Sequence, residues 1–535
     1  MASISLRQGV LGKRLAAHLL RRSSFKVTPA RIADFASKTA QQAVDELFVV
    51  PPLTHPEGPI NWVDGVTAWL TTGPYENNPQ NGGQQKQAVL TWLTNEMLHD
   101  ASISHKMTLF WSSIFVTEMD TDWRMFELWR LFQQFAVGNI KTLAYKVTLD
   151  NKMLRYLNNN INNKNSPNEN YAREFFELFT ILKGEQIDTG NYSNYTEHDI
   201  QEAARVLTGF VTSNTYVDPE TGRRAGVASF GKHDAGNKKF SAAFGHQHIT
   251  GATSASDMYR ELQDFVDMIF GQVETARAFV RRMYRFFVSD FLTEEIENDV
   301  IEPLAQQLFS DGYEVENTLK TLLRSVHFYD EDDSDNHDEI IGGKIKSPLE
   351  LYLSGINLFD ANQMGVLNDD PAENYSKGSW LISYNLVPLG FSYYPSSVEG
   401  YPGFFKAPNY SKSWFDQATI SSRYRLSYSF LQGRTVKNNK TIPFAINTVN
   451  YFNTHFSNQS YSDELVTQLL EIALPEMPDT DRFEYFRQKL LGQLSPINWA
   501  FEWANYESTG DGAAIEIALN DLFAAVCDSP EFQTF

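Results

Sequence analysis

The chain has 535 residues, a formal net charge of −21 and a single cysteine, Cys527. A surface this acidic repels phosphate backbones, which argues against nucleic acid or an anionic membrane as the main partner. One cysteine excludes an intrachain disulfide and a metal site built from several thiolates. No apolar run approaches the roughly 20 residues of a membrane span, and the 42% hydrophobic content is that of a globular protein.

The first residues predict a helix rather than a signal peptide. Leu11, Leu15, Leu19 and Leu20 recur at helical spacing, which indicates an amphipathic helix. Lysines and arginines interrupt this segment, so it lacks the uninterrupted apolar stretch of a secretory signal. The lack of such a stretch predicts a cytoplasmic protein. Export by a route that needs no leader is the alternative, so the compartment is left open.

Helical patterns dominate the rest of the chain. Thr28 is the predicted N-cap of a helix, and Pro29 occupies its first position. This helix is predicted to run from Pro29 to Phe48. Ser166 and Glu169 have the spacing of a capping box at the start of another helix. Further helices are predicted at 84–115, 123–149, 168–183, 197–208, 256–270, 274–289, 294–310, 314–327, 349–360, 371–386, 413–431, 461–474, 480–492 and 511–528.

Two segments break the helical pattern. Between 210 and 250, short β-like runs flank Asp218–Gly222, where Pro and Gly predict a hairpin turn. Residues 330–343 form an acidic loop whose spacing does not fit an EF-hand, so a solvated loop is favoured over a Ca²⁺ site. The predicted fold is mainly α: a single large multi-helix module over 1–535, with a small β-hairpin insertion near 210–250.

The segment from Ser166 to Leu182 carries the clearest pattern. Its apolar residues form one helical stripe, while Arg173, Glu174 and Glu177 fall on another face at spacings of three and four. In a buried cleft these three side chains could orient or protonate a substrate. On an exposed face they would form an ordinary i,i+4 ion pair.

This segment resembles the core motif of the bacterial domain-of-unknown-function family numbered 1800, Pro-Asn-Glu-Asn-Tyr-Ala-Arg-Glu-Leu-x-Glu-Leu-Phe. Other family motifs recur in the right order, so the resemblance covers residues 15–532 and favours one module. They are found at Ala17–Arg22, Thr196–Phe210, His233–Lys238, Lys344–Glu350, Val398–Gly403 and Ser529–Phe532. Members of this family are often exported and are often encoded beside a protein that resembles alkaline phosphatases. The resemblance therefore implies that neighbouring product as the protein partner.

One departure from the family pattern bears on function. The family has Phe-Trp-His-Asn-His-Phe where this chain has Phe-Trp-Ser-Ser-Ile-Phe over Phe110–Phe115, so both histidines are absent. A metal or proton-transfer centre that used those histidines would be incomplete here. No Walker loop, zinc-protease helix or Gly-x-Ser-x-Gly elbow is present either.

The remaining histidines are weak metal candidates. His233 and Asp234 could supply a ligand pair, a base or a loop anchor. On a strand, His246 and His248 would point the same way, yet two imidazoles make at most half of a tetrahedral site. No cofactor is therefore expected, and one divalent metal ion is the alternative.

Three functions remain open. The leading one is a non-catalytic, degenerate-site protein with a structural or partner-binding role. The second is a metal-assisted enzyme that uses Arg173, Glu174, Glu177, His233 and Asp234. The third, which rests on ring content alone, is a carbohydrate-binding surface built from Tyr393, Tyr394, Tyr401, Phe404, Phe405 and Trp414.

Overall fold

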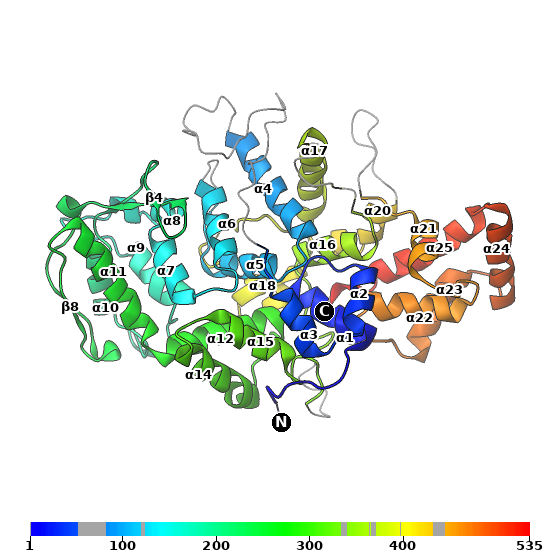
Figure 1. The fold of residues 1–535 in the computed structure, drawn as a ribbon, viewed down its shortest axis with the longest axis horizontal. Helices are drawn as coiled ribbons and strands as arrows, with labels where there is room; N and C mark the ends of the chain where they lie inside the picture. The colour runs from blue at the N-terminus through cyan, green and yellow to red at the C-terminus, as the bar shows by residue number, and fades with distance from the viewer. Residues whose placement is uncertain are drawn as a thin grey trace.

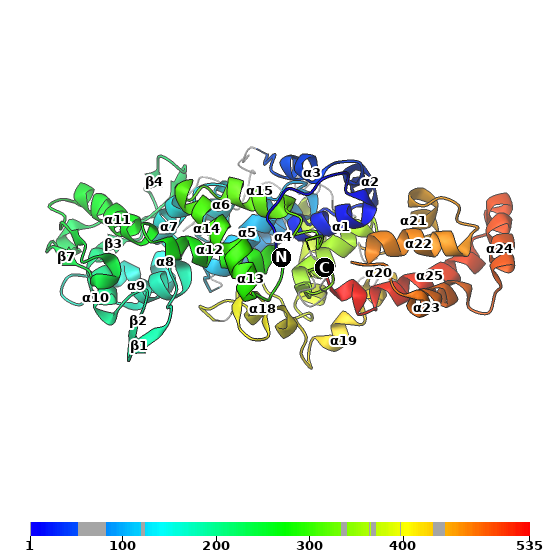
Figure 2. The same ribbon diagram turned by 90° about the horizontal axis from the view of Figure 1, so that it is seen from below.

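The computed structural model of the protein describes residues 2–51, 82–118, 124–332, 340–362, 364, 371–395, 397–431 and 444–535. Helices dominate these residues, and the strands form short antiparallel pairs, so the predicted fold class is confirmed. The molecule is elongated: the β strands lie at one end, the last helices lie at the other, and both chain ends lie near the middle (Figures 1 and 2). Within the described ranges, no helix is both long and apolar enough to cross a bilayer.

The N-terminal helices are shorter than predicted because polar side chains cap new helices inside the predicted ranges. Thr39 forms a capping box with Gln42 and divides the helix predicted from Pro29 to Phe48. Asn139 accepts a hydrogen bond from the Thr142 amide at 2.9 Å and divides the range 123–149. The helices are α1 (Gly12–Ser23), α2 (Pro29–Ala36), α3 (Ala40–Leu47), α4 (Gly82–His99), α5 (Ser104–Ile114), α6 (Arg124–Gln134), α7 (Ile140–Thr148) and α8 (Asn151–Tyr156).

The helix predicted over 168–183 is short and changes type. α9 (Asn170–Glu174) continues directly into the π-helix η3 (Phe175–Phe179). The predicted Ser166 cap is wrong, because Asn168 Oδ1 accepts the hydrogen bond of the Asn170 amide at 2.9 Å. The apolar stripe is confirmed in its centre, where Tyr171, Phe175 and Phe179 are buried.

Four short strand pairs flank the next helix, α10 (Glu197–Val206). β1 (Gln186–Asp188) pairs with β2 (Asn191–Tyr192), outside the predicted insertion. Inside it, β3 (Phe210–Val211) pairs with β6 (Val227–Ala228), β4 (Val217–Asp218) with β5 (Arg223–Arg224), and β7 (Lys238–Lys239) with β8 (His248–Ile249). The β4–β5 hairpin closes the predicted turn, with Gly222 at a φ of 67°, which glycine adopts without strain.

The middle of the chain follows the predicted order of helices. It contains α11 (Ala255–Phe270), α12 (Val273–Phe287), α13 (Glu294–Ile296), the π-helix η6 (Glu297–Ile301), α14 (Glu302–Ser310) and α15 (Val315–Arg324). The predicted acidic loop at 330–343 lies largely outside the described residues, which omit 333–339. At its described start, Asp332 accepts a hydrogen bond from His327 Nδ1 at 2.7 Å.

The C-terminal part contains three helices that were not predicted, the short α18 and the longer α21 and α24. The range 413–431, predicted as one helix, is broken into short pieces. The helices are α16 (Pro348–Leu358), α17 (Pro371–Leu381), the π-helix η8 (Ile382–Leu386), α18 (Pro402–Phe405), α19 (Ile420–Arg423), α20 (Leu426–Leu431), α21 (Thr448–His455), α22 (Ser462–Ala473), α23 (Thr480–Leu491), α24 (Pro496–Thr509) and α25 (Ala513–Cys527).

Contacts distant in sequence join the two halves of the chain. Buried apolar side chains from Ala2 to Phe532 form one contiguous cluster. Arg22 of α1 donates hydrogen bonds to the carbonyls of Phe287, at 3.0 Å, and of Ile340, at 2.5 Å. Lys106 Nζ pairs with Glu350 across the two halves at 2.8 Å, and within the second half Lys346 Nζ donates to the carbonyl of Phe532 at 2.7 Å. A core shared in this way supports the organisation as one module.

A shared core predicts one cooperative unfolding transition. Differential scanning calorimetry should give a single endotherm, because neither half can keep its buried cations paired without the other. Limited proteolysis near residue 340 should release no stable half. Two separate endotherms, or a folded fragment that survives cleavage there, would contradict the single-module organisation.

Candidate functional site

Arg173, the centre of the best-marked motif, ties α9 to the first residue of α10. Its guanidinium donates to both carboxylate oxygens of Glu197, at 2.9 and 2.6 Å, and to Glu169 at 3.0 Å. This hydrogen bonding lowers the pKa of Glu197. Arg173 is therefore fully engaged in an ion-pair cluster at the surface.

The two other candidate carboxylates of this motif lie beside Arg173. Glu177 pairs with Lys183 at 2.9 Å and lies 3.9 Å from the Arg173 guanidinium. Burial raises the pKa of Glu174, and the neighbouring charge of Glu177 adds to the effect. The structure thus brings Arg173, Glu174 and Glu177 together, as the spacing predicted.

His233 lies in a different, fully buried cluster. Its Nδ1 lies 2.8 Å from the carbonyl oxygen of Thr208, and its Nε2 lies 3.1 Å from Glu261 Oε2. Glu261 also pairs with Lys238, and the side chains of all three charged or titratable residues have no exposed surface. Both ring nitrogens are engaged within the protein, so a metal ion would have to displace one of these contacts. Glu261 was not predicted as part of this cluster, since it lies on α11, far along the sequence.

Asp234, the neighbour of His233, anchors its loop to the far end of α10. Arg205 donates to its two oxygens at 2.8 and 3.2 Å, and the Gly236 amide donates to Oδ1 at 2.9 Å. Burial alone would raise the pKa of Asp234, but the bonds from Arg205 and from the Gly236 amide, with the nearby positive charges, together outweigh it and lower the pKa.

The five candidate residues do not meet in one cleft. Glu197, which holds Arg173, begins α10, and Arg205, which holds Asp234, is eight residues further along it. At a rise of 1.5 Å per residue, these anchor points lie about 12 Å apart along the helix. The five residues therefore belong to two separate ion-pair networks and not to a single site. A catalytic role for them stays a prediction.

The other histidine candidates are exposed and lie on a turn rather than along one strand. Only His248 belongs to β8, while His246 has a φ of 56°, in the left-handed region. In the parts of the chain that the structure describes, no three His, Cys, Asp or Glu residues group as metal ligands would. Ser112 and Ser113 donate to carbonyls of their own helix, at 2.8 and 2.7 Å, and Ile114 is buried.

Two of the family-like motifs and the departing segment Phe110–Phe115 converge around one cavity of about 170 Å³, which we call the motif cavity. Residues from Phe110–Phe115, from the end of η3 and from Val398–Gly403 line it, together with α12 and α18. The polar groups in its wall are Ser113, Arg282, Arg285 and Glu399. No sequence pattern pointed to the two arginines, because their place depends on how α12 packs against η3.

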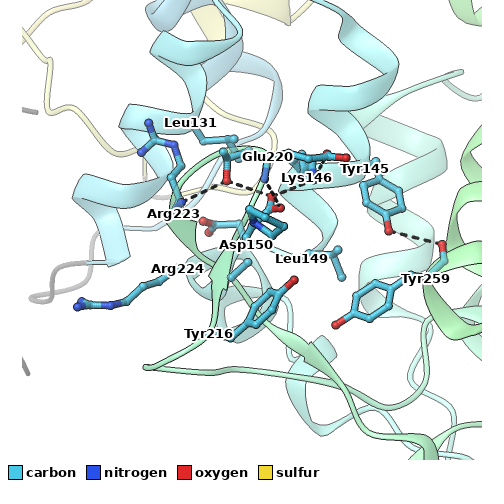
Figure 3. A pocket seen from close by; sticks show the side chains of 14 residues that line it. Leu131, Tyr145, Lys146, Leu149, Asp150, Tyr216, Glu220, Arg223, Arg224 and Tyr259 are labelled. Carbon is cyan, nitrogen blue, oxygen red and sulfur yellow. Dashed lines mark hydrogen bonds and ion pairs between the residues drawn. The ribbon is translucent and has the colours of Figure 1, made fainter. Parts of the chain in front are cut away.

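A second cavity of about 210 Å³ lies under the β4–β5 hairpin, and we call it the hairpin cavity (Figure 3). Asp150 lies at its base, between Arg223 and Arg224 on one side and Tyr145 and Tyr259 on the other (Figure 3). Asp150 Oδ1 caps α8 by accepting the amides of Lys152 and Met153 at 2.8 and 3.1 Å.

The electrostatics of the hairpin cavity are set by burial. Loss of water raises the pKa of Asp150 to about 7, although its two backbone hydrogen bonds oppose the shift. Burial also lowers the pKa of Arg223 to about 9, against the charge of Glu127. Asp150 was not singled out from the sequence; its position directly before a helix, where Asp is a common N-cap, was the available signal.

Three of the six rings proposed as a carbohydrate-binding surface belong to the core, and Tyr401, Phe404 and Phe405 are partly exposed. Tyr393, Tyr394 and Trp414 are buried, and Tyr394 accepts a hydrogen bond from Trp129 at 2.6 Å. The Tyr393 hydroxyl lies 2.6 Å from Thr94 Oγ1. These three rings belong to the core, and a carbohydrate-binding role for the partly exposed rings stays a prediction.

An apolar groove lies at the far end of the molecule, between the start of α22 and α24, and we call it the C-terminal groove. Its volume is about 560 Å³, and Tyr461, Ile497 and Phe501 line it together with Asp463 and Glu464. The three apolar side chains are 63%, 69% and 68% exposed. Side chains this apolar and this exposed mark an interaction surface when they adjoin one another.

Comparison with known proteins agrees with the motifs. The family model described as "Protein of unknown function (DUF1800)" matches residues 18–534, nearly the whole chain. The chain belongs to this family. No curated protein and no solved structure matches it. Membership in DUF1800 thus covers residues 18–534 and leaves the function to be argued from the sites described above.

The buried cluster of this DUF1800 member predicts a large stability effect. Replacing Glu261 by alanine should lower the free energy of unfolding by about 3–5 kcal/mol, because it leaves the buried ammonium of Lys238 without a carboxylate, with only the carbonyl of Asp234 as its partner. The control is Asp264→Ala on the same helix, which breaks an exposed pair with Arg260 and should cost at most about 1 kcal/mol. Equal urea midpoints for the two variants would contradict a structural role for the cluster.

The hairpin cavity predicts a specific pH dependence. Between about pH 4 and pH 7, folded Asp150 keeps a proton that the unfolded chain has released, so the wild type loses stability as pH rises through this window. Asp150→Asn removes this contribution, and its stability relative to wild type should rise by up to about 1.4 kcal/mol per pH unit. Urea unfolding at several pH values measures the difference. Parallel stability curves for variant and wild type would refute the raised pKa.

Proposed function

We propose that this protein is a non-catalytic, partner-binding component that holds a basic amphipathic helix of another protein in its C-terminal groove. The observation that carries the proposal is the unpartnered apolar face of α24. No cofactor is part of it. The metal-assisted alternative would need its five residues in one place, and they belong to two networks joined to opposite ends of α10.

The apolar residues of α24 form two faces, and only one is used inside the protein. Trp499 and Trp503, four residues apart, are buried against the body of the molecule. Ile497, Ala500, Phe501 and Ala504 have the i, i+3, i+4, i+7 spacing of a second stripe, and all four line the groove. A helix of a folded protein that exposes such a stripe presents it to another chain.

The charges around the groove favour a basic partner. α22 and α24 together carry five acidic residues and no lysine or arginine. Two of the five, Asp463 and Glu464, belong to the groove wall itself. Lysines or arginines along the edges of an incoming helix would face these carboxylates, while its apolar face packs on Ile497 and Phe501. The same charges disfavour nucleic acid and a second copy of this acidic chain.

The scaffold supports this role because packed helices connect the groove to the centre of the molecule. α24 packs on α25 and α22, and α22 in turn contacts α1 near the centre of the molecule. Arg21 of α1 donates to the carbonyls of Ile472 and Leu474, at 2.5 and 3.1 Å, at the end of α22. The family-like motif at Ala17–Arg22 thereby holds the end of α22 opposite the groove.

A synthetic helix tests the groove directly. The probe is a fluorescent peptide of about five helical turns, with leucines at i, i+3, i+4 and i+7 and lysines on both flanks. Fluorescence anisotropy should show binding to the wild type. The double variant Ile497→Ser, Phe501→Ser should weaken it at least about tenfold, because each buried side chain contributes about 1.5–3 kcal/mol.

Two controls separate the groove from general stickiness. Ile517→Ser removes an equally exposed isoleucine of α25 and should leave binding unchanged. A peptide with glutamates in place of the lysines should not bind. Equal binding of the two peptides would overturn the proposal. So would a concentration-dependent dimer, seen by analytical ultracentrifugation and lost in the double variant, since it would assign the groove to self-association.

A further inference from the structure

The motif cavity contains two guanidinium groups on one helix, in a protein that is otherwise strongly acidic. Arg282 and Arg285 lie three residues apart on α12, and both line the cavity. In the described part of the chain, neither has a carboxylate within ion-pair distance. Elsewhere on the same helix, Arg277 and Arg281 are each paired with glutamates.

The surroundings make the charges of both arginines costly. Burial lowers the pKa of Arg282 to about 9, and the like charge of Arg285 adds to the shift. Burial also lowers the pKa of Arg285. Two partly desolvated cations that repel each other destabilise the protein unless an anion neutralises them.

The two arginines differ in how much of their hydrogen bonding is already satisfied. Arg282 donates to the carbonyls of Leu178 and Phe179, the latter at 3.3 Å, at the end of η3. Arg285 lies over the ring of Tyr410, with 5.1 Å between guanidinium carbon and ring centroid. Its buried Nε has no hydrogen-bond partner among the described residues. Arg285 therefore offers donors to a ligand, and Arg282 adds charge beside it.

The nearby carboxylates do not occupy this position. Asp290 accepts hydrogen bonds from the amide and hydroxyl of Ser411, and Glu297 is paired with Arg281 at 2.9 Å. Glu399 lines the cavity but is exposed to solvent, so it lies at the mouth. An anion that enters would pass Glu399 and meet Arg285.

The rest of the wall is apolar and sets the kind of anion. Ile114, Leu178, Phe286, Phe404 and Phe405 line the cavity. Its volume of about 170 Å³ is close to that of a cavity of about 150 Å³ that holds benzene. We propose that the motif cavity binds a small carboxylic acid with an aromatic or branched aliphatic body. The carboxylate contacts Arg285 and the body lies among the phenylalanine rings, an arrangement for which the planar guanidinium is suited.

Benzoate is the probe, and isothermal titration calorimetry with the full chain is the measurement. Benzoate should bind one site per chain, and benzamide, which has the same shape without the charge, should bind at least about tenfold more weakly. Arg285→Met should weaken benzoate binding at least about tenfold. Arg285→Lys should give an intermediate loss of affinity, because lysine keeps the positive charge but cannot donate two parallel hydrogen bonds to the carboxylate. Glu399→Gln should strengthen benzoate about two- to threefold by removing a like charge at the mouth.

The matched control is Arg277→Met, which removes an arginine of α12 that lies outside the cavity and should leave benzoate binding unchanged. Circular dichroism establishes that each variant is folded. Benzoate binding that survives Arg285→Met in folded protein would overturn the proposal. Binding of inorganic phosphate as tight as that of benzoate would also overturn it, since phosphate has no apolar body to use the rings.

Discussion

A buried ion pair between Lys106 and Glu350 lies at the centre of the molecule, and the packing of the rest depends on it. The two atoms are 2.8 Å apart, and both side chains are almost fully shielded from water. Burial alone would raise the pKa of Glu350, but Lys106 and Lys344 outweigh it and lower the pKa. The surplus cations are held by main-chain oxygens: Lys344 by Phe286, Lys346 by Phe532 and Arg22 by Phe287. Buried polar groups must be paired, so these contacts fix how four distant segments meet.

This constraint gives a physical meaning to the family-like motifs. In Lys344–Glu350 the two lysines bind carbonyls, Ser347 and Glu350 form the capping box of α16, and Glu350 holds Lys106. In the motif around Arg173 the charges join α9 to α10, and in His233–Lys238 they form the buried cluster with Glu261. Motif residues with these roles hold the helices together. Binding is proposed elsewhere: a partner helix in the C-terminal groove and a small carboxylic acid in the motif cavity.

The sequence predicted the fold where a pattern is local and failed where it is not. The hairpin over Asp218–Gly222 and the stripe of Tyr171, Phe175 and Phe179 follow from turn chemistry and helical period, and both are confirmed. The Ser166 cap failed because Asn168 competes for the same helix start. α24 was missed because apolar residues on two faces hide its period. The partners Glu261 for His233 and Glu197 for Arg173 could not be predicted, since tertiary packing alone brings them together. The same holds for Asp150 and the arginines of the motif cavity.

The long sequence separation of the central contacts affects how the chain is made. Arg22 emerges from the ribosome 318 residues before its acceptor Ile340, and Lys346 precedes its acceptor Phe532 by 186. At a synthesis rate of about 5–20 residues per second, roughly 15–65 s pass between the synthesis of Arg22 and that of Ile340, whose carbonyl accepts its hydrogen bond. During this time the apolar faces of α1 have no completed core to enter. Translation speed and protection of the nascent chain therefore bear directly on the yield of folded protein, because the slow step of assembly is set by topology rather than by any single helix.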